Sequence, residues 1–273
     1  RAIEWLAAAG APVVLMSATL PASQRIAFYR AYETGRCARL GIRGPDEGDL
    51  AEHLSGDVGY PSIAVTGTEG PEVTVVPVHA QQREIAVRRL GDDTASLVAL
   101  LGEKLREGGC AVVIRNTVRR AQQTAREMRE AFPDVEVRVA HASFLAADRA
   151  RIDGDLVRLF GPPDRAERPQ RSIVVATQVV EQSLDIDFDL MVTDLAPVDL
   201  VLQRIGRLHR HQRERPAPVA VPACYVAGAD WAEDPPKPDG GAVAVYGRWS
   251  LLASLAVLGE ALDGAPVVLP RDI

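Results

Sequence analysis

Short apolar runs alternate with amphipathic stretches over much of the chain, and this alternation constrains the fold more than any other feature. The runs at residues 110–115 and 172–176 have the length and apolar character of buried strands. Stretches with helical spacing lie between such runs, for example at residues 117–132 and 146–160. Alternation of this kind predicts βαβ units, in which helices cover both faces of a parallel sheet. We therefore expect a doubly wound α/β domain over residues 74–228.

The same periodicity predicts the remaining elements. Further strands are expected at residues 11–16, 72–79, 135–141, 189–194 and 223–227, and further helices at residues 21–30, 94–107, 199–207 and 246–262. Glycine and proline punctuate the stretch from about residue 41 to 72, which predicts a connector with at most short strands.

Composition excludes several classes of protein. The chain is 47% hydrophobic, which argues against disorder, and no apolar run approaches the roughly 20 residues that a membrane span needs. Cys37, Cys110 and Cys224 form no Cys-x-x-Cys pair, so we expect buried thiols in a cytoplasmic protein rather than a disulfide framework or a zinc site. The net charge of −6 argues against non-specific nucleic-acid binding over the whole surface but allows a local basic groove.

Polar residues follow several of the expected strands, where ligands bind in an open parallel sheet. Ser17 and Thr19, in a Ser-Ala-Thr sequence, suit either a helix cap or a relay of hydrogen bonds from a bound phosphate. Thr117, after Asn116, is expected to cap the helix that starts there, and the free amides of that helix favour a phosphate. His141 closes another strand, where its role is either structural or functional.

One segment carries the most specific pattern. A buried strand ends in Thr177 and Gln178, and a Leu-Asp pair that contains Asp185 follows. Farther along, the sequence QRIGRLHR at residues 203–210 places two arginines three positions apart, which we interpret as one face of the helix expected at residues 199–207. Two arginines without adjacent acids are costly to hold together unless an anion compensates them, so the pattern favours an anion site over a solvated basic face.

Taken in chain order, these sequences resemble the later motifs of superfamily 2 helicases: Ser-Ala-Thr, Asn-Thr, Ala-Thr-x-Val with Leu-Asp, and Gln-x-x-Gly-Arg-x-x-Arg. More narrowly, RNTVRRAQ at 115–122, HASF at 141–144 and the segment 177–211 resemble the CRISPR-associated helicase–nuclease of type I systems, a DExH-type helicase. The resemblance covers most of residues 11–228. A Gln-Ser pair stands before Leu-Asp where the general motif has Arg-Gly-x-Asp, which fits the CRISPR family better than the RNA helicases.

The resemblance implies a fold and a domain organisation. It implies that the doubly wound sheet is RecA-like and forms the second helicase lobe over residues 74–228. The end of a first lobe would occupy residues 1–40, a connector residues 41–73, and a linker with the start of a helical C-terminal region residues 229–273. The chain is thus expected to be a piece of a longer motor protein.

The resemblance also implies roles for individual residues. Ser17 and Thr19 would couple the nucleotide state to lobe movement, and Asp185 and Gly206 would lie near the nucleotide. Gln203, Arg207 and Arg210 would face the ATP phosphates, with Arg210 as the preferred arginine finger. The residues implied along single-stranded DNA are Asn116, Thr117, His141, Thr177 and Gln178.

The function implied is that of an ATP- and Mg²⁺-dependent DNA translocase and helicase that unwinds and degrades target DNA after recruitment by a guide-RNA surveillance complex. The sequence contains no Gly-x-x-x-x-Gly-Lys-[Ser/Thr] loop and no Asp-Glu-x-His box, and its five histidines form no metal cluster, so no metal ligands are assigned. We therefore predict that this chain alone neither hydrolyses ATP nor cuts DNA, but binds single-stranded DNA weakly and in a salt-sensitive way. The alternatives are another superfamily 2 helicase acting on RNA or DNA, and a stand-alone nucleic-acid-binding lobe from a split gene.

Overall fold

The computed structural model describes residues 1–17, 20–44, 61–67, 70–76, 82–181, 184–269 and 271–272. The chain divides into two compact units, residues 1–81 with residue 273, and residues 82–272. Ser17 and Thr19 belong to the first unit and the other candidate residues to the second. Thr19 lies outside the described residues.

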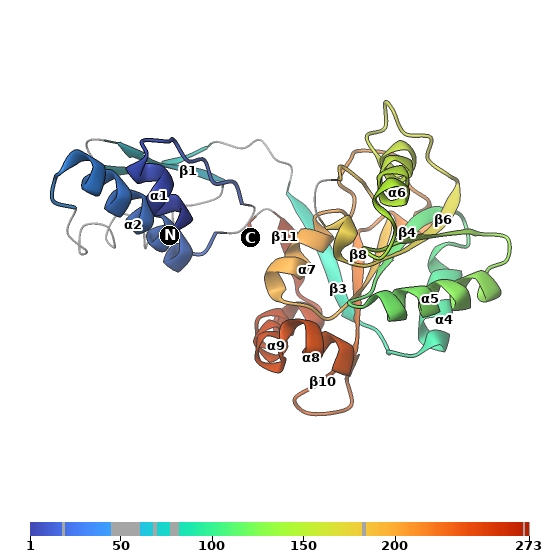
Figure 1. The fold of residues 1–273 in the computed structure, drawn as a ribbon. Coiled ribbons are helices and arrows are strands. Elements are labelled where there is room, and N and C mark those ends of the chain that lie inside the picture. The colour runs from blue at the N-terminus through green and yellow to red at the C-terminus, as the bar shows by residue number, and fades with distance from the viewer. Residues whose placement is uncertain are drawn as a thin grey trace. The chain divides into compact units, whose positions relative to one another are not determined.

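The first unit pairs two helices and contains a β-hairpin (Figure 1). Its elements are α1 (Ala2–Ala8), α2 (Ala22–Leu40), β1 (Ser62–Gly67) and β2 (Gly70–Val75), with β1 and β2 antiparallel. The two helices pack so closely that a Cβ atom on Gly35 would lie 2.0 Å from the carbonyl oxygen of Glu4, so glycine is required there. The hydroxyl of Thr66 donates a 2.7 Å hydrogen bond to the buried carboxylate of Glu33, which ties the hairpin to α2.

Two strand predictions in this unit are corrected. Residues 11–16 form no strand, and the side chains of Val14 and Met16 are 82% and 91% exposed. An apolar run becomes a strand only when a neighbour pairs with it, and no described segment of the unit does so. The strand expected at residues 72–79 belongs to the hairpin and ends at Val75, while residues 77–79 lie outside the described part.

The helix cap suggested for Ser17 is not found at α2. Pro21, not Ser17, is the N-cap of that helix, so capping of α2 does not explain the presence of Ser17.

The second unit is a seven-stranded sheet in the order β11-β3-β8-β7-β4-β6-β5, in which β11 is antiparallel to β3 and all other neighbours are parallel. Its strands are β3 (Arg83–Arg89), β4 (Gly109–Ile114), β5 (Glu136–Ala140), β6 (Arg171–Ala176), β7 (Leu190–Asp194), β8 (Ala223–Ala227) and β11 (Pro266–Leu269). Its helices are α4 (Thr94–Lys104), α5 (Val118–Ala131), α6 (Ala146–Phe160), α7 (Val198–Ile205), α8 (Gly240–Tyr246) and α9 (Arg248–Leu262). Short elements complete it: η1 (Gln178–Val180), η2 (Ala217–Val219), β9 (Ala229–Asp230) and β10 (Lys237–Pro238).

Helices cover both faces of this sheet, as the alternation of apolar and amphipathic segments predicts (Figure 1). Successive side chains of a strand point to opposite faces. Within β4, Val112 and Ile114 therefore pack against α6, α7 and α9, whereas Ala111 and Val113 pack against α4 and α5. Every residue of β4 is buried, which is why this strand reads as a continuous apolar run.

The borders of the sheet differ from the prediction. It begins with β3 rather than near residue 74, and it ends with β11, in a region expected to be a linker and a helix. In β3 only Ile85 and Val87 are buried among charged neighbours, so the strand has a weak apolar signal. The helix expected at residues 246–262 is confirmed as α9. A further helix, α8, precedes it in a stretch expected to be a linker, and Gly247, with a φ of 79°, separates the two helices.

Two further findings concern the whole of the described part. Cys37, Cys110 and Cys224 are buried and free, as predicted, and burial raises the pKa of the Cys110 and Cys224 thiols to about 12. No single helix in the described ranges has the length and apolar character needed to cross a membrane; α8 and α9 reach it only together, across a bend of 103°.

Candidate functional site

Five candidate residues of the second unit lie at the carboxyl edge of its parallel sheet. Asn116 and Thr117 follow β4, His141 follows β5, and Thr177 and Gln178 follow β6. The carboxyl ends of parallel strands share one edge, so the fold brings these five residues to one side of the sheet.

The remaining candidates do not follow the carboxyl end of a strand directly. Asp185 precedes β7, Gln203 and Gly206 lie at the end of α7, and Arg207 and Arg210 follow that helix. Arg83, which opens β3, donates to the carbonyl of Leu208 at 2.7 Å, so the chain just before Arg210 lies near the amino edge of the sheet.

The loop after β4 is held by the end of β7. The carboxylate of Asp194 accepts hydrogen bonds from Arg115 Nη1 at 2.8 Å and from the backbone N–H of Asn116 at 3.0 Å. The Asn116 amide donates to the carbonyl of Leu195 at 2.8 Å, and its side chain is buried. Thr117 caps α5 as predicted, since its hydroxyl accepts from the N–H of Arg120. Backbone N–H groups at the start of α5 are therefore fixed in place, while the Asn116 side chain is turned inward.

Arg204 is the central side chain of the edge, and the sequence interpretation missed it. It is fully buried, its Nε donates to Glu181 Oε1 at 2.7 Å, and its Nη1 donates to the Thr193 hydroxyl at 2.7 Å and to the Asp194 carbonyl at 3.0 Å. Longer bonds from Nη2 reach the Asn116 amide oxygen (3.4 Å) and the Tyr246 hydroxyl (3.3 Å). The sequence did indicate that this arginine is buried, because Arg204 lies on the same face of α7 as residues of the apolar core.

The interpretation of Arg207 and Arg210 as one helical face is wrong. Helix α7 ends at Ile205, and Gly206 is its C-cap with an ordinary φ of −59°. The guanidinium of Arg207 donates to the carbonyl oxygens of Leu184 (2.6 Å) and Glu181 (2.8 Å). Arg207 therefore holds the chain that precedes β7.

Arg210 differs from Arg207 in exposure and in partner. Its side chain is 42% exposed, and its Nε donates to Asp185 Oδ1 at 2.6 Å. The expectation of arginines without an adjacent acid is thus corrected, because Asp185 comes to Arg210 from 25 residues away in sequence. Gln203 is half-buried and makes no hydrogen bond within the described ranges.

A buried carboxylate fixes the backbone beneath Arg210. Asp187 Oδ1 accepts from the N–H of Arg210 at 2.7 Å, and the same carboxylate pairs with Arg213 (2.7 Å) and Arg215 (2.9 Å). His209, just before, has a positive φ of 47°, an uncommon conformation for a residue other than glycine. The Asp187 network therefore holds Arg210 at a defined place next to Asp185.

His141 packs against one aromatic side chain and lies next to α5. Its ring stacks on Phe144 with centroids 4.1 Å apart and an interplanar angle of 6°, and its Nε2 lies 3.1 Å from Gln122 Nε2. Burial lowers the pKa of His141 below its ordinary value, which favours the neutral imidazole. The side chain is 5% exposed, so the structure gives His141 a packing role at the edge.

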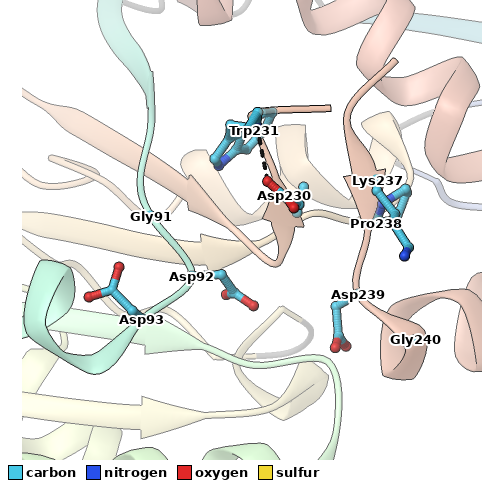
Figure 2. A pocket seen from close by; sticks show the side chains of 11 residues that line it. Gly91, Asp92, Asp93, Asp230, Trp231, Lys237, Pro238, Asp239 and Gly240 are labelled. Carbon is cyan, nitrogen blue, oxygen red and sulfur yellow. Dashed lines mark hydrogen bonds between the residues drawn. The ribbon is translucent and has the colours of Figure 1, made fainter. Parts of the chain in front are cut away.

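An open hollow of about 650 Å³ lies next to these loops and is lined by residues 91–93, 229–232 and 237–240 (Figure 2). Its carboxylates have structural partners: Asp93 accepts from the N–H of Ser96, Asp239 from that of Gly241, and Asp92 from that of Gly228. Acidic lining of this kind repels phosphate. No group of His, Cys, Asp and Glu side chains suited to hold a metal ion occurs in the part of the chain that the structure describes.

Comparisons with known proteins agree with this geometry. A family model described as "CRISPR-associated nuclease/helicase Cas3, C-terminal" matches residues 107–213. The CRISPR-associated nuclease/helicase Cas3 of Streptococcus thermophilus is 39% identical over 275 residues, which cover all of this chain and 28% of that protein. The crystal structure of T. fusca Cas3-ATP aligns with a TM-score of 0.82 and 30% identity, over 99% of this chain and 32% of that one. A chain of a CRISPR RNA-guided surveillance complex, pre-nicking, aligns with a TM-score of 0.80 and 30% identity, over 99% and 34%.

The sheet and the loops along its carboxyl edge define the C-terminal RecA-like lobe of a helicase, so the predicted fold class is confirmed. The chain belongs to the Cas3 nuclease/helicase family, and it corresponds to a C-terminal portion of a Cas3 protein. It spans 28% of the length of the S. thermophilus relative.

The buried ion pair of Arg204 gives a prediction for stability. Arg204→Met removes the cation and leaves Glu181 buried without compensation, which typically costs about 3–5 kcal/mol of unfolding free energy. Urea unfolding followed by circular dichroism measures the loss. The control is Arg151→Met on α6, where Arg151 is 67% exposed and pairs with acids on its own helix, so the expected loss is below about 1 kcal/mol. Equal losses in both variants would contradict the central role of Arg204.

The two buried histidines predict a pH dependence with a defined sign. Burial lowers the pKa of both His141 and His209 in the folded chain, whereas an unfolded histidine has a pKa of about 6.5. The unfolded chain therefore takes up protons first, and the unfolding free energy falls as the pH drops through about 6.5. Histidine NMR titration and urea unfolding between about pH 8 and 5.5 check this. A His141 midpoint above 6.5 would refute the prediction, and His141→Gln should flatten the decline.

Proposed function

We propose that this chain forms the C-terminal motor part of an ATP-dependent DNA helicase–nuclease of CRISPR interference. The observation that carries the proposal is the placement of Thr117 and Thr177 after neighbouring strands at the carboxyl edge of a RecA-like sheet, together with the exposed Arg210–Asp185 pair on the chain around β7 and α7. The names of the relatives support it, since they are nuclease/helicases, and so does a solved relative described as Cas3-ATP.

For nucleic acid, the proposed contact surface is the set of backbone N–H groups and hydroxyls at the starts of α5 and η1. Helix N-termini favour phosphate through unpaired N–H groups and the helix dipole, and Thr117 and Thr177 lie at those starts. Asn116, His141 and Thr177 have buried side chains, so we assign those side chains to shaping this surface from behind. Gln178 remains part of the proposed path through its backbone.

For the nucleotide, we propose Arg210 as the residue that binds a phosphate, because its side chain is exposed and its carboxylate partner is half exposed. Arg207 fits the role less well, since carbonyl oxygens already accept from its guanidinium. We propose that Gln203, Gly206 and Asp185 border the same place. ATP with Mg²⁺, held mainly by a first lobe, would supply the free energy for movement, and Ser17 and Thr19 would couple the two lobes.

The domain organisation, partners and compartment belong to the same proposal. We assign residues 1–40 to the end of a first lobe and residues 41–81 to a connector. Because β3 starts the sheet and β11 completes it, we assign residues 82–272 to the second lobe together with the start of a C-terminal region. A relative's presence in a CRISPR RNA-guided surveillance complex supports such a complex as a partner. Free buried cysteines in the described residues are typical of the reducing cytoplasm.

Binding of single-stranded DNA tests the nucleic-acid part of the proposal. Thr117→Asp keeps a good helix cap but adds a negative charge where a phosphate is proposed to bind. We expect the chain to bind a fluorescent oligonucleotide at low salt with an affinity that falls steeply as salt rises, and the variant to bind about tenfold more weakly. Ala131→Glu, exposed at the C-terminal end of α5, adds the same charge about 20 Å from Thr117 along the helix and should leave binding nearly unchanged. Absence of binding by the unaltered chain at low salt would rule out the proposed path.

An ATP hydrolysis assay tests the proposal that the part of a first lobe absent from this chain supplies most of the ATP-binding groups. The chain lacks a phosphate loop with its lysine, so ATPase turnover with single-stranded DNA should not exceed the buffer blank. Arg210→Ala serves as the paired variant and should give the same background. Robust turnover that disappears in Arg210→Ala would show that this chain forms a complete ATPase and would overturn the prediction.

A further inference from the structure

The hydroxyl of Tyr246 connects the helices after the sheet to the edge that carries the candidate site. Tyr246 is the last residue of α8, and its hydroxyl accepts a 2.8 Å hydrogen bond from Gln178 Nε2 and a 3.3 Å bond from Arg204 Nη2. This single oxygen atom therefore links α8 to both η1 and α7, which lie far from α8 in the sequence.

The bond to Tyr246 changes the chemical role of Gln178. Its side-chain nitrogen donates both to Tyr246 and to the carbonyl oxygen of Asn116, at 3.1 Å. An amide nitrogen has two hydrogens, so both are engaged and neither is available for a phosphate. The side chain thus anchors the start of η1, a turn that the proposed function places next to the DNA strand.

Helix α8 is itself firmly placed, which makes it a suitable support. Asp239 caps the helix by accepting from the N–H groups of Gly241 and Ala242, and Ala242 is fully buried. A Cβ atom on Gly241 would lie 3.2 Å from Thr117 Cγ2, so the first turn of α8 lies against the start of α5. The helix therefore touches the edge at both of its ends, at Thr117 and at Gln178.

We propose that Tyr246 is a positioning residue, which orients the Thr177–Gln178 turn and makes α8 part of the single-stranded DNA interface. The part of this inference that concerns DNA rests on the proposed function. The tether itself rests on the hydrogen bonds among Tyr246, Gln178 and Arg204. No nucleic-acid contact by Tyr246 is required.

Tyr246→Phe in the 273-residue chain tests the proposal, because it removes the hydroxyl and keeps the ring. The Gln178 side-chain amide signals in a ¹⁵N-correlated NMR spectrum should shift without DNA, since one hydrogen-bond partner is lost. Affinity for a single-stranded oligonucleotide should fall about 3- to 10-fold, the effect of one hydrogen bond. The slope of log affinity against log salt should stay unchanged, because no phosphate contact is removed.

Tyr225→Phe is the matched control, a buried tyrosine on β8 in the same unit, and it should change neither the Gln178 signals nor the affinity. Unchanged Gln178 signals in Tyr246→Phe would overturn the tether. Shifted signals with unchanged affinity would overturn its role in DNA binding. A flatter salt slope requires the loss of a cationic contact to phosphate, and it would contradict a role limited to positioning the turn. If the unaltered chain binds no DNA while the Gln178 signals shift, the tether is supported and the proposed function fails.

Discussion

The buried guanidinium of Arg204 is the constraint on which the carboxyl edge depends. A charge without access to water is tolerated only when it is paired and its donors are satisfied. Arg204 meets that demand with acceptors from four separate segments, supplied by Asn116, Glu181, Thr193 with Asp194, and Tyr246. Such a pair need not raise net stability. Its effect is geometric, because the segments must assemble in one arrangement before the charge is compensated.

The arginines around the end of α7 have distinct roles that their spacing does not reveal. Arg204 is buried and organises the edge, Arg207 binds carbonyl oxygens of the chain before β7, and Arg210 is exposed beside Asp185. The network of Asp187 then fixes the backbone at Arg210. A group that meets an anion is most effective when it is preorganised, and the surrounding bonds provide that rigidity for Arg210.

Much of the fold was predictable because β4, β6 and β7 are buried on both faces and give unbroken apolar runs. The borders were not, because β3 and β11 form one end of the sheet and β3 buries only alternate residues. At the candidate site, the sequence correctly predicted the cap at Thr117. It did not identify Arg204 or Tyr246, because their partners are far away in sequence and a local pattern carries no information about them.

The position of β3 within the sheet has a consequence for how the second unit acquires its structure. The first strand of this unit lies between β8 and β11, so it pairs with residues 223–227 and 266–269, which are synthesised long after it. Contacts between residues so far apart in sequence can form only after the chain has lost the entropy of closing a long loop. During translation β3 must therefore wait, with one hydrogen-bonding edge unfilled, until residues 266–269 have left the ribosome.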